Sequence, residues 1–280
     1  MAIKLIALDL DGTLITRDLK VSKANREAIR WAAEQNIHVV VATGRSMGIV
    51  PPDVFMIPEI RYLITSNGAI ISDKQKGVIS RTCIDEEVMQ QLIKSVDGLD
   101  EMVEYFVEGV SHTQTKFWEI VENAHRRGQK SPYYYYHRVP EADLPSFARK
   151  NAKHVEMMCV KYGLAADPRV KMALHEKVLA IGGVKATTSL PFDCEVVSGR
   201  AGKGMALMKL ADILGVEPHE IMAMGDSLND LEMIQKAGIG VAMGDARMEL
   251  KPEADFVTKT NQEDGVAHAI YEMVEKHRGV

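Results

Sequence analysis

Strand and helix signals alternate at both ends of the chain, and this alternation restricts the fold more than any other feature of the 280 residues. In the N-terminal part, short apolar runs over residues 4–9, 38–43 and 61–65 read as strands, and residues 23–35 read as a helix capped by Ser22. Strands that alternate with helices in this way build parallel sheets. We therefore predict an α/β core of the Rossmann type, a parallel sheet with helices on both faces.

The same alternation returns after residue 202, whereas residues 83–189 lack it. That middle segment mixes helical patches with strand-like pieces, which are residues 86–96, 117–126, 133–139 and 155–162. Because each outer half needs the other to complete a sheet, we expect residues 1–82 and 190–280 to form one discontinuous core. Residues 83–189 then form an inserted α+β domain.

Composition excludes several classes of protein. The net charge of -5 argues against a protein that mainly binds nucleic acid. No apolar run approaches the roughly 20 residues that span a bilayer, so we expect no membrane partner. The chain begins with Met and enters a strand-like segment directly, without a signal peptide, so we expect a cytoplasmic protein. Its three cysteines are far apart and we expect reduced, buried thiols.

Small and polar residues follow four of the predicted strands, at the point where each strand ends. These segments are residues 9–13, 43–45, 65–68 and 225–230. In an open parallel sheet, ligands bind in the crevice at the carboxyl ends of the strands. If the strands are predicted correctly, all four segments converge on that crevice.

The convergence brings four carboxylates together, namely those of Asp9, Asp11, Asp226 and Asp230. Two carboxylates about 4 Å apart repel by about 4 kcal/mol at an effective dielectric constant of 20. The alternative is that these aspartates are ordinary turn and cap residues, which one Asp-Gly turn would justify but four carboxylates at two strand ends do not. Oxygen ligands suit a hard cation, so we predict Mg²⁺.

These segments resemble the motifs of the haloacid dehalogenase (HAD) superfamily. Asp9-Leu10-Asp11-Gly12-Thr13 is similar to its first motif, Thr43 to its second, Lys203 to its third and residues 225–230 to its fourth, in the family's order. The insertion falls between the second and third motifs, as in members with a type C2 cap. Residues 240–244 and 261–267 resemble the Cof-type (type IIB) sugar-phosphate phosphatases.

The resemblance implies a role for each carboxylate. Asp9 would be the nucleophile that forms an aspartyl phosphate, and Asp11 would be the general acid and base. A carboxylate is already ionised at neutral pH, so we expect Asp9 to need no activating base. Mg²⁺ would be held by Asp9, the backbone carbonyl of Asp11 and Asp226, with Asp230 in support.

The resemblance also implies a phosphate-binding set. Lys203, between two glycines at a predicted helix start, would neutralise a phosphoryl oxygen. Thr43, Gly44 and Asn229 would donate hydrogen bonds to phosphate.

Several further positions stay open. Arg45 either reaches the substrate or pairs with a core carboxylate. Ser66, Asn67 and Gly68 either touch the ligand or only form a turn. Two positions depart from the Cof-type pattern: residues 197–201 lack the expected proline or lysine, and Asp245 replaces a frequent asparagine.

The function we expect is the Mg²⁺-dependent hydrolysis of a small phosphorylated metabolite. By resemblance this is a sugar phosphate, with phosphorylated flavin precursors and pyridoxal phosphate as alternatives. A phosphomutase on the same scaffold and a non-catalytic sensor of a phospho-ligand are the rival functions. Tyr133–Tyr136 either line the cap pocket or form a cap strand with alternate buried rings, and the oligomeric state is left open.

Overall fold

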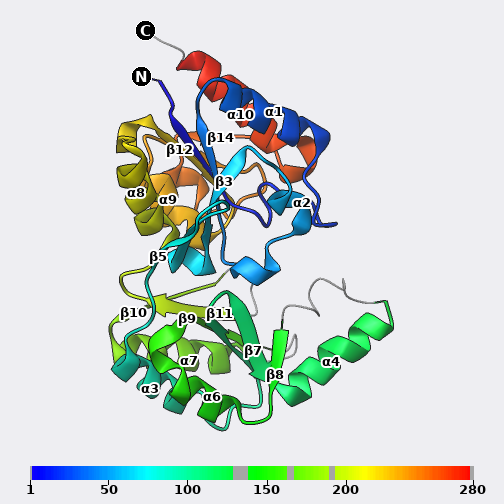
Figure 1. Ribbon diagram of the computed structural model, residues 1–280, viewed down its shortest axis with the longest axis vertical. Helices are drawn as coiled ribbons and strands as arrows, with labels where there is room; N and C mark the ends of the chain where they lie inside the picture. The colour runs from blue at the N-terminus through cyan, green and yellow to red at the C-terminus, as the bar shows by residue number, and fades with distance from the viewer. Residues whose placement is uncertain (1, 129–137, 163–166, 189–192, 278–280) are drawn as a thin grey trace. The chain divides into compact units, whose positions relative to one another are not determined.

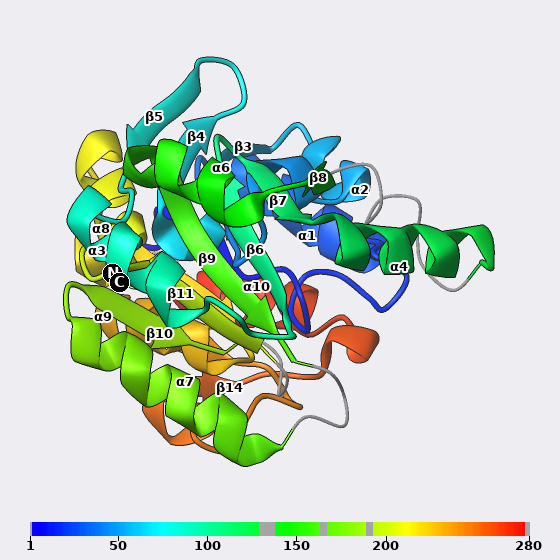
Figure 2. The ribbon, with the colours of Figure 1, turned by 90° about the horizontal axis from the view of Figure 1, so that it is seen from below.

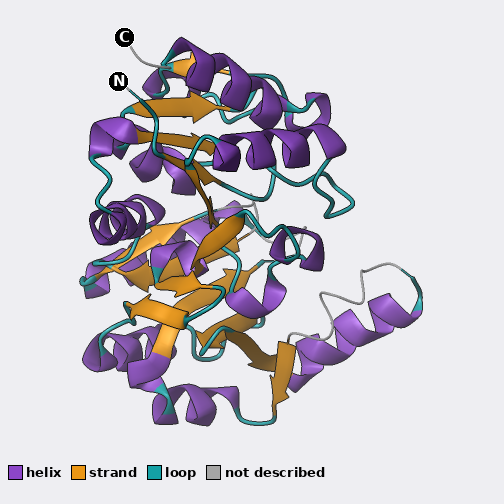
Figure 3. Cartoon of the chain, turned by 45° about the horizontal axis from the view of Figure 1, so that its top comes forward, coloured by secondary structure: helices purple, strands orange, loops and turns teal. Residues whose placement is uncertain are grey.

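The computed structural model describes residues 2–128, 138–162, 167–188 and 193–277, and these divide into two compact units (Figure 1). The first unit comprises Met1–Gly44, Val50–Ser80 and Gly202–Val280, and the second comprises Arg45–Ile49 and Arg81–Ala201. Each unit has its own sheet, as the strands in Figure 3 show. Tyr133–Tyr136 lie outside the described residues. None of the described helices combines the length and the apolar character that crossing a membrane requires.

Within the described residues, the first unit contains an eight-stranded sheet in the order β14-β13-β12-β1-β2-β3-β4-β5. The strands are β1 (Leu5–Leu8), β2 (His38–Ala42), β3 (Ile60–Thr65), β4 (Ile70–Asp73), β5 (Gly77–Arg81), β12 (Ile221–Gly225), β13 (Ile239–Ala242) and β14 (Phe256–Val257). β1 lies at the centre, and it pairs in parallel with β2 and with β12. Its four residues are fully buried, as expected for a strand covered on both faces.

Helices cover both faces of this sheet, which confirms the predicted fold class. They are α1 (Lys23–Glu34), α2 (Pro52–Phe55), α8 (Lys203–Leu214), α9 (Leu231–Lys236) and α10 (Gly265–Lys276). On one face, Leu207 and Leu210 of α8 pack against Leu5 and Val40 of the sheet. α1 and α10 pack against each other on the opposite side in Figure 1.

One part of the first sheet departs from the predicted parallel order. β4 runs antiparallel to β3, with Leu63 opposite Ser72, and β5 lies next to β4 at the edge of the sheet. The prediction missed both strands. The chain reverses through Ser66-Asn67-Gly68, where all three residues have positive φ.

The second unit contains, among the described residues, a six-stranded sheet in the order β10-β11-β9-β6-β7-β8. Its strands are β6 (Met102–Val107), β7 (Val110–Gln114), β8 (Arg138–Glu141), β9 (Val155–Lys161), β10 (Val184–Thr187) and β11 (Asp193–Ser198), and its helices are α3 (Glu86–Ser95), α4 (Thr115–Arg126), α6 (Leu144–Lys150) and α7 (Pro168–Ile181). An apolar core joins Tyr105 and Val160 of the sheet to α3, α6 and α7. Figure 2 shows α7 running along β10, which it contacts.

The second unit differs from the predicted insertion at its C-terminal boundary. We expected the chain to return to the core at residue 190, but the unit extends to Ala201. The reason is strand pairing: β11 runs antiparallel between β9 and β10, with Val196 opposite Met158. All three cysteines are free. Cys159 and Cys194 are buried in this unit, but Cys83 is half-buried, so the prediction of a buried thiol is wrong for that residue.

A buried ion pair lies in the sheet of the second unit. The Glu104 carboxylate is fully buried, and its Oε1 accepts hydrogen bonds from Ser111 Oγ and Arg138 Nε, each at 2.6 Å. Lys161 Nζ lies 3.5 Å from Glu104 Oε2. Burial alone would raise the pKa of Glu104, but Arg138 and Lys161 outweigh it and lower the pKa to about 2.

The Glu104→Gln variant should have a lower free energy of unfolding than wild type near neutral pH, and this difference should shrink in acid. The folded pKa of Glu104 lies below the ordinary value of 4.5, so its charge stabilises the fold above that pH and ceases to do so as the pH falls to about 2. We expect the difference in free energy of unfolding between wild type and Glu104→Gln to shrink by about 3 kcal/mol over this range. Urea unfolding at a series of pH values measures it, with the exposed Glu176→Gln as a control that should show no such trend. Parallel pH profiles for wild type and Glu104→Gln would contradict the assignment.

Candidate active site

Asp9 lies one residue beyond β1, at the carboxyl edge of the first sheet. Its backbone N–H donates to the carbonyl of Met224 at 3.0 Å, which continues the parallel pairing of β1 with β12. The residues that follow β12 therefore lie beside Asp9. The residue is only 4% exposed.

Lys203 joins two of the carboxylates. Its Nζ lies 2.7 Å from Asp9 Oδ1 and 2.7 Å from Asp230 Oδ1, and all three side chains are buried. Burial alone would lower the pKa of Lys203, but Asp230 and Asp9 raise it above its usual value, so the ammonium stays charged. Lys203 is the first residue of α8, where the helix dipole disfavours a cation, and the two carboxylates offset this effect.

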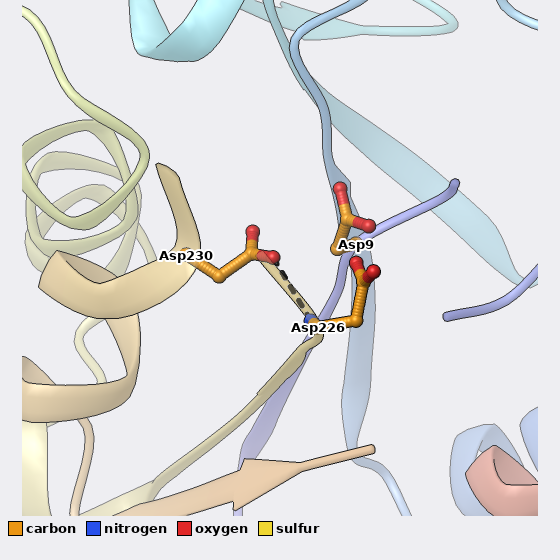
Figure 4. Close-up of side chains that lie close together, drawn as sticks. All are labelled: Asp9, Asp226 and Asp230. Carbon is orange, nitrogen blue, oxygen red and sulfur yellow. Dashed lines mark hydrogen bonds between the residues drawn. The ribbon is translucent and has the colours of Figure 1, made fainter. Parts of the chain in front are cut away.

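Asp230 also binds the backbone of the loop that carries Asp226. Its Oδ2 accepts hydrogen bonds from the N–H groups of Asp226 and Ser227, each at 3.0 Å. Figure 4 shows the first of these bonds and the three carboxylates that face one another. Since Oδ1 binds Lys203 and Oδ2 binds the loop, Asp230 is suited to orient its neighbours.

Asp226 has an oxygen that fits a metal ion. Ser227 Oγ donates to Asp226 Oδ2 at 3.2 Å, while Asp226 Oδ1 is buried and has no hydrogen-bond partner among the described residues. An unpaired buried carboxylate oxygen is costly unless a cation occupies its lone pairs. Oxygens of Asp9, Asp226 and Asp230 lie within 4.8 Å of one another, which is close enough to share one ion.

The cluster also raises the pKa values of its members. Burial first, and Asp230 second, raise the pKa of Asp226 to about 7 and that of Asp9 well above its usual value. Burial and the neighbouring carboxylates therefore work against the ionised form of Asp9 that the sequence predicts. Lys203 opposes the shift, and a bound divalent cation would oppose it further. Asp11, two residues on, is exposed.

Gly12 leaves space for the Asp226 carboxylate. Its φ is +84°, and a Cβ at this position would lie 2.4 Å from Asp226 Oδ2. Both the left-handed backbone and the close approach require glycine. Residues 9–13 and 225–230 can therefore pack together only if position 12 is a glycine.

The Gly12→Ala variant should lose activity as well as stability. We expect a loss of about 2 kcal/mol in the free energy of unfolding, from backbone strain and from displacement of the Asp226 carboxylate. Gly77→Ala is the matched control, because Gly77 has a φ of +85° with open space at its Cβ. It should show the strain cost alone and full turnover. Equal turnover in both variants would show that the Asp226 contact is unimportant.

The predicted phosphate-binding residues of the first unit also come together. Thr43 is buried at the end of β2, and its carbonyl accepts the N–H of Asn67 at 3.1 Å. Asn229 Nδ2 donates to Asn67 Oδ1 at 3.1 Å. Gly44 follows Thr43 directly, and its surface is half-buried.

Two contacts in this part of the site were absent from the prediction. A Cβ on Gly68 would lie 2.1 Å from the Gly202 carbonyl oxygen, so the turn after β3 packs directly on the start of α8. Asp245, noted only as a departure from the family pattern, adds to the rise in the pKa of Asp226. The Ser66-Asn67-Gly68 run signals a turn, but its partners are far away in the sequence.

Arg45 belongs to the second unit. Its Nη1 donates to the carbonyl of Ile49 at 3.0 Å, and the side chain is buried. It is therefore the one predicted site residue that the division into units separates from the rest.

Comparison with known proteins gives a consistent result. Residues 6–270 match the family described as haloacid dehalogenase-like hydrolase. The 5-amino-6-(5-phospho-D-ribitylamino)uracil phosphatase YcsE of Bacillus subtilis is 33% identical over 273 residues, which cover 97% of this chain and 96% of the relative. The phosphatase YwpJ of Bacillus subtilis is 31% identical over 97% of this chain and 100% of the relative.

Several solved structures also resemble the chain. A haloacid dehalogenase-like hydrolase from B. subtilis matches with a TM-score of 0.83 and 28% identity, over 97% of this chain and 100% of that one. A sugar phosphatase of HAD subclass IIB matches with a TM-score of 0.78 at 22% identity, over 96% of this chain and 98% of that one, which shows a common fold.

Proposed function

Since the chain belongs to the haloacid dehalogenase-like hydrolase family and is one of its phosphatases, we propose that it hydrolyses a small phosphorylated metabolite with Mg²⁺, through an aspartyl phosphate on Asp9. The observation that carries this proposal is the arrangement of Asp9, Lys203 and Asp226 at the carboxyl edge of the sheet. It combines a carboxylate nucleophile, a buried cation and an unsatisfied carboxylate oxygen.

The reaction has two steps on this chain. The Asp9 carboxylate attacks phosphorus and forms an O–P bond as the bond to the leaving alkoxide breaks, and Asp11 gives that alkoxide a proton. Asp11 then takes a proton from the water that attacks the aspartyl phosphate, which frees Asp9 and inorganic phosphate. The exposure of Asp11, two residues from a buried Asp9, supports this division of roles.

Three groups would hold the metal: the side chains of Asp9 and Asp226 and the backbone carbonyl of Asp11. Asp230 supports them, because both of its oxygens already have partners. A bound Mg²⁺ would supply positive charge for the phosphoryl oxygens and for the carboxylates. Lys203 neutralises a further phosphoryl oxygen, and Thr43, the Gly44 N–H and Asn229 donate hydrogen bonds to the phosphate.

We propose that the second unit is the cap of this phosphatase and that it selects the part of the substrate that leaves with the alkoxide. A cap that closes would exclude water from the first step. The separate sheet and core of this unit support the assignment. Arg45 would then act with the cap.

The substrate class is a small sugar or sugar-alcohol phosphate. YcsE is named for a substrate with a phosphorylated ribityl chain, which makes such a compound the first candidate. A phosphomutase would use the same nucleophile, but it would return the phosphoryl group to the product. The family match as a hydrolase favours hydrolysis.

The test is release of inorganic phosphate from a panel of phosphorylated small molecules, with Mg²⁺ and with a chelator. We expect at least one compound to yield phosphate and its alcohol in equal amounts, and the chelator to stop the reaction. A bisphosphate product without net phosphate would instead show a mutase. Turnover that is unchanged by the chelator would contradict the metal assignment.

A further inference from the structure

The turn after β3 touches three of the segments that surround the proposed phosphate site. Asn67 accepts a hydrogen bond from Asn229 through its side chain and donates one to the Thr43 carbonyl through its backbone. Gly68, the next residue, packs against the Gly202 carbonyl, one residue before Lys203. A single turn therefore contacts the residue that follows β2, the 3-10 turn Leu228–Asp230 that follows β12, and the start of α8.

The backbone of this turn is left-handed at three consecutive residues. The φ angles are 50° at Ser66, 49° at Asn67 and 88° at Gly68. Among residues other than glycine, asparagine adopts this conformation at comparatively low cost. Asn67 is also 3% exposed, so its side chain is packed against neighbouring groups.

The side-chain bond determines which group Asn229 presents. A carboxamide has two N–H donors on one end and an acceptor oxygen on the other, and a phosphate oxygen requires a donor. Asn229 Nδ2 gives one N–H to Asn67 Oδ1 and keeps its second N–H on the same nitrogen. Asn229 Oδ1 has no hydrogen-bond partner among the described residues. The bond from Nδ2 to Asn67 is therefore the side-chain hydrogen bond that keeps the carboxamide from rotating by 180°.

We propose that Asn67 is a positioning residue for the phosphatase reaction: it fixes the carboxamide of Asn229 so that one N–H is available to the phosphoryl group. This inference rests on the proposed function, because it assigns Asn229 to the phosphate. In this role Asn67 does not touch the substrate. The sequence left open whether this turn contacts the ligand or is only a turn, and the proposal gives Asn67 an indirect role that differs from both.

Glycine and alanine at position 67 separate this role from that of a turn former. Both remove the acceptor, but glycine accepts the left-handed backbone and alanine does not. A residue needed only for the turn would be replaced by glycine without loss. We expect Asn67→Gly and Asn67→Ala to raise KM for p-nitrophenyl phosphate and Ki for inorganic phosphate by about tenfold each, with little change in kcat, while only Asn67→Ala loses thermal stability.

A double-mutant cycle with Asn229→Ala completes the experiment. Because Asn67 acts through Asn229, the Asn67→Gly/Asn229→Ala variant should be about tenfold weaker than wild type in phosphate binding, as each single variant is, and not about a hundredfold weaker. A wild-type KM and Ki in Asn67→Gly, or additive losses in the double variant, would overturn the inference. If wild type has no Mg²⁺-dependent phosphatase activity to measure, the proposed function itself has failed, which is a different result.

Discussion

Replacement of Lys203 by methionine should greatly reduce catalytic efficiency and destabilise the first unit. Lys203 is the buried cation between Asp9 and Asp230, with an ion pair of 2.7 Å to each. Methionine has a similar length but no charge, so two buried carboxylates lose their partner. We expect a loss of about 3–5 kcal/mol in the free energy of unfolding, measured in chelator. We expect kcat/KM to fall by about 10³-fold.

The stability loss should depend on pH in a defined direction. Burial and Asp230 already raise the pKa of Asp9, and removal of Lys203 takes away the group that opposes this rise. A group with a raised folded pKa stabilises the fold below its ordinary pKa of 3.8 and costs stability as the pH rises. The deficit of Lys203→Met should therefore be smallest in acid and grow toward neutral pH.

Lys209→Met is the matched control, because Lys209 lies on the same helix and is exposed. Its free energy of unfolding should lie within about 0.5 kcal/mol of the wild-type value, and its kcat/KM should equal that of wild type. Equal free energies of unfolding for Lys203→Met and wild type in chelator would show that the ion pairs of Lys203 do not stabilise the fold.

The Asp9→Asn variant should fold but lose phosphate release. Asparagine has nearly the same shape as aspartate but cannot attack phosphorus as a carboxylate. The loss should be at least about 10⁴-fold in kcat, as for removal of other enzymatic nucleophiles. Asp9 is buried beside Asp230 and Asp226, so a neutral residue there also relieves repulsion. We therefore expect a smaller loss in the free energy of unfolding than for Lys203→Met.

Asp212→Asn serves as its control, since Asp212 is an exposed carboxylate on α8. Phosphate release is the measurement, with circular dichroism to confirm the fold of each variant. Retention of wild-type turnover by Asp9→Asn would show that another group receives the phosphoryl.

The convergence of the site could be predicted because it depends on the parallel direction of the strands and not on contacts between side chains. Asp9 and Asp226 follow strands that read clearly as apolar runs, and β1 and β12 are neighbours in the sheet. Parallel neighbours end at the same edge, so the two carboxylates had to meet. The same argument brought Thr43 into the site after β2.

The boundary of the second unit, the return through β4 and the bond between Asp230 and Lys203 could not be predicted, because they depend on contacts between residues that are distant in sequence. The prediction assigned residues 193–198 to the core, and only their pairing with β9 and β10 shows that they belong to the second unit. The return through β4 depends on three left-handed residues, which a sequence marks as a turn without giving its direction. Asp230 was predicted to support the metal, but its bond to Lys203 requires two segments 27 residues apart to be in register.

The most direct test of the central claim is burst kinetics of the Asp11→Asn variant with p-nitrophenyl phosphate. The p-nitrophenolate leaving group of this substrate needs no proton, so Asp9 should still be phosphorylated. Hydrolysis of the aspartyl phosphate should be slow, because the Asp11 carboxylate that would act as the base is missing. We predict a burst of one p-nitrophenolate per chain, followed by a slow phase, with the phosphoryl group on the peptide that contains Asp9. A linear progress curve without a burst, or a phosphoryl group on a different peptide, would contradict the account.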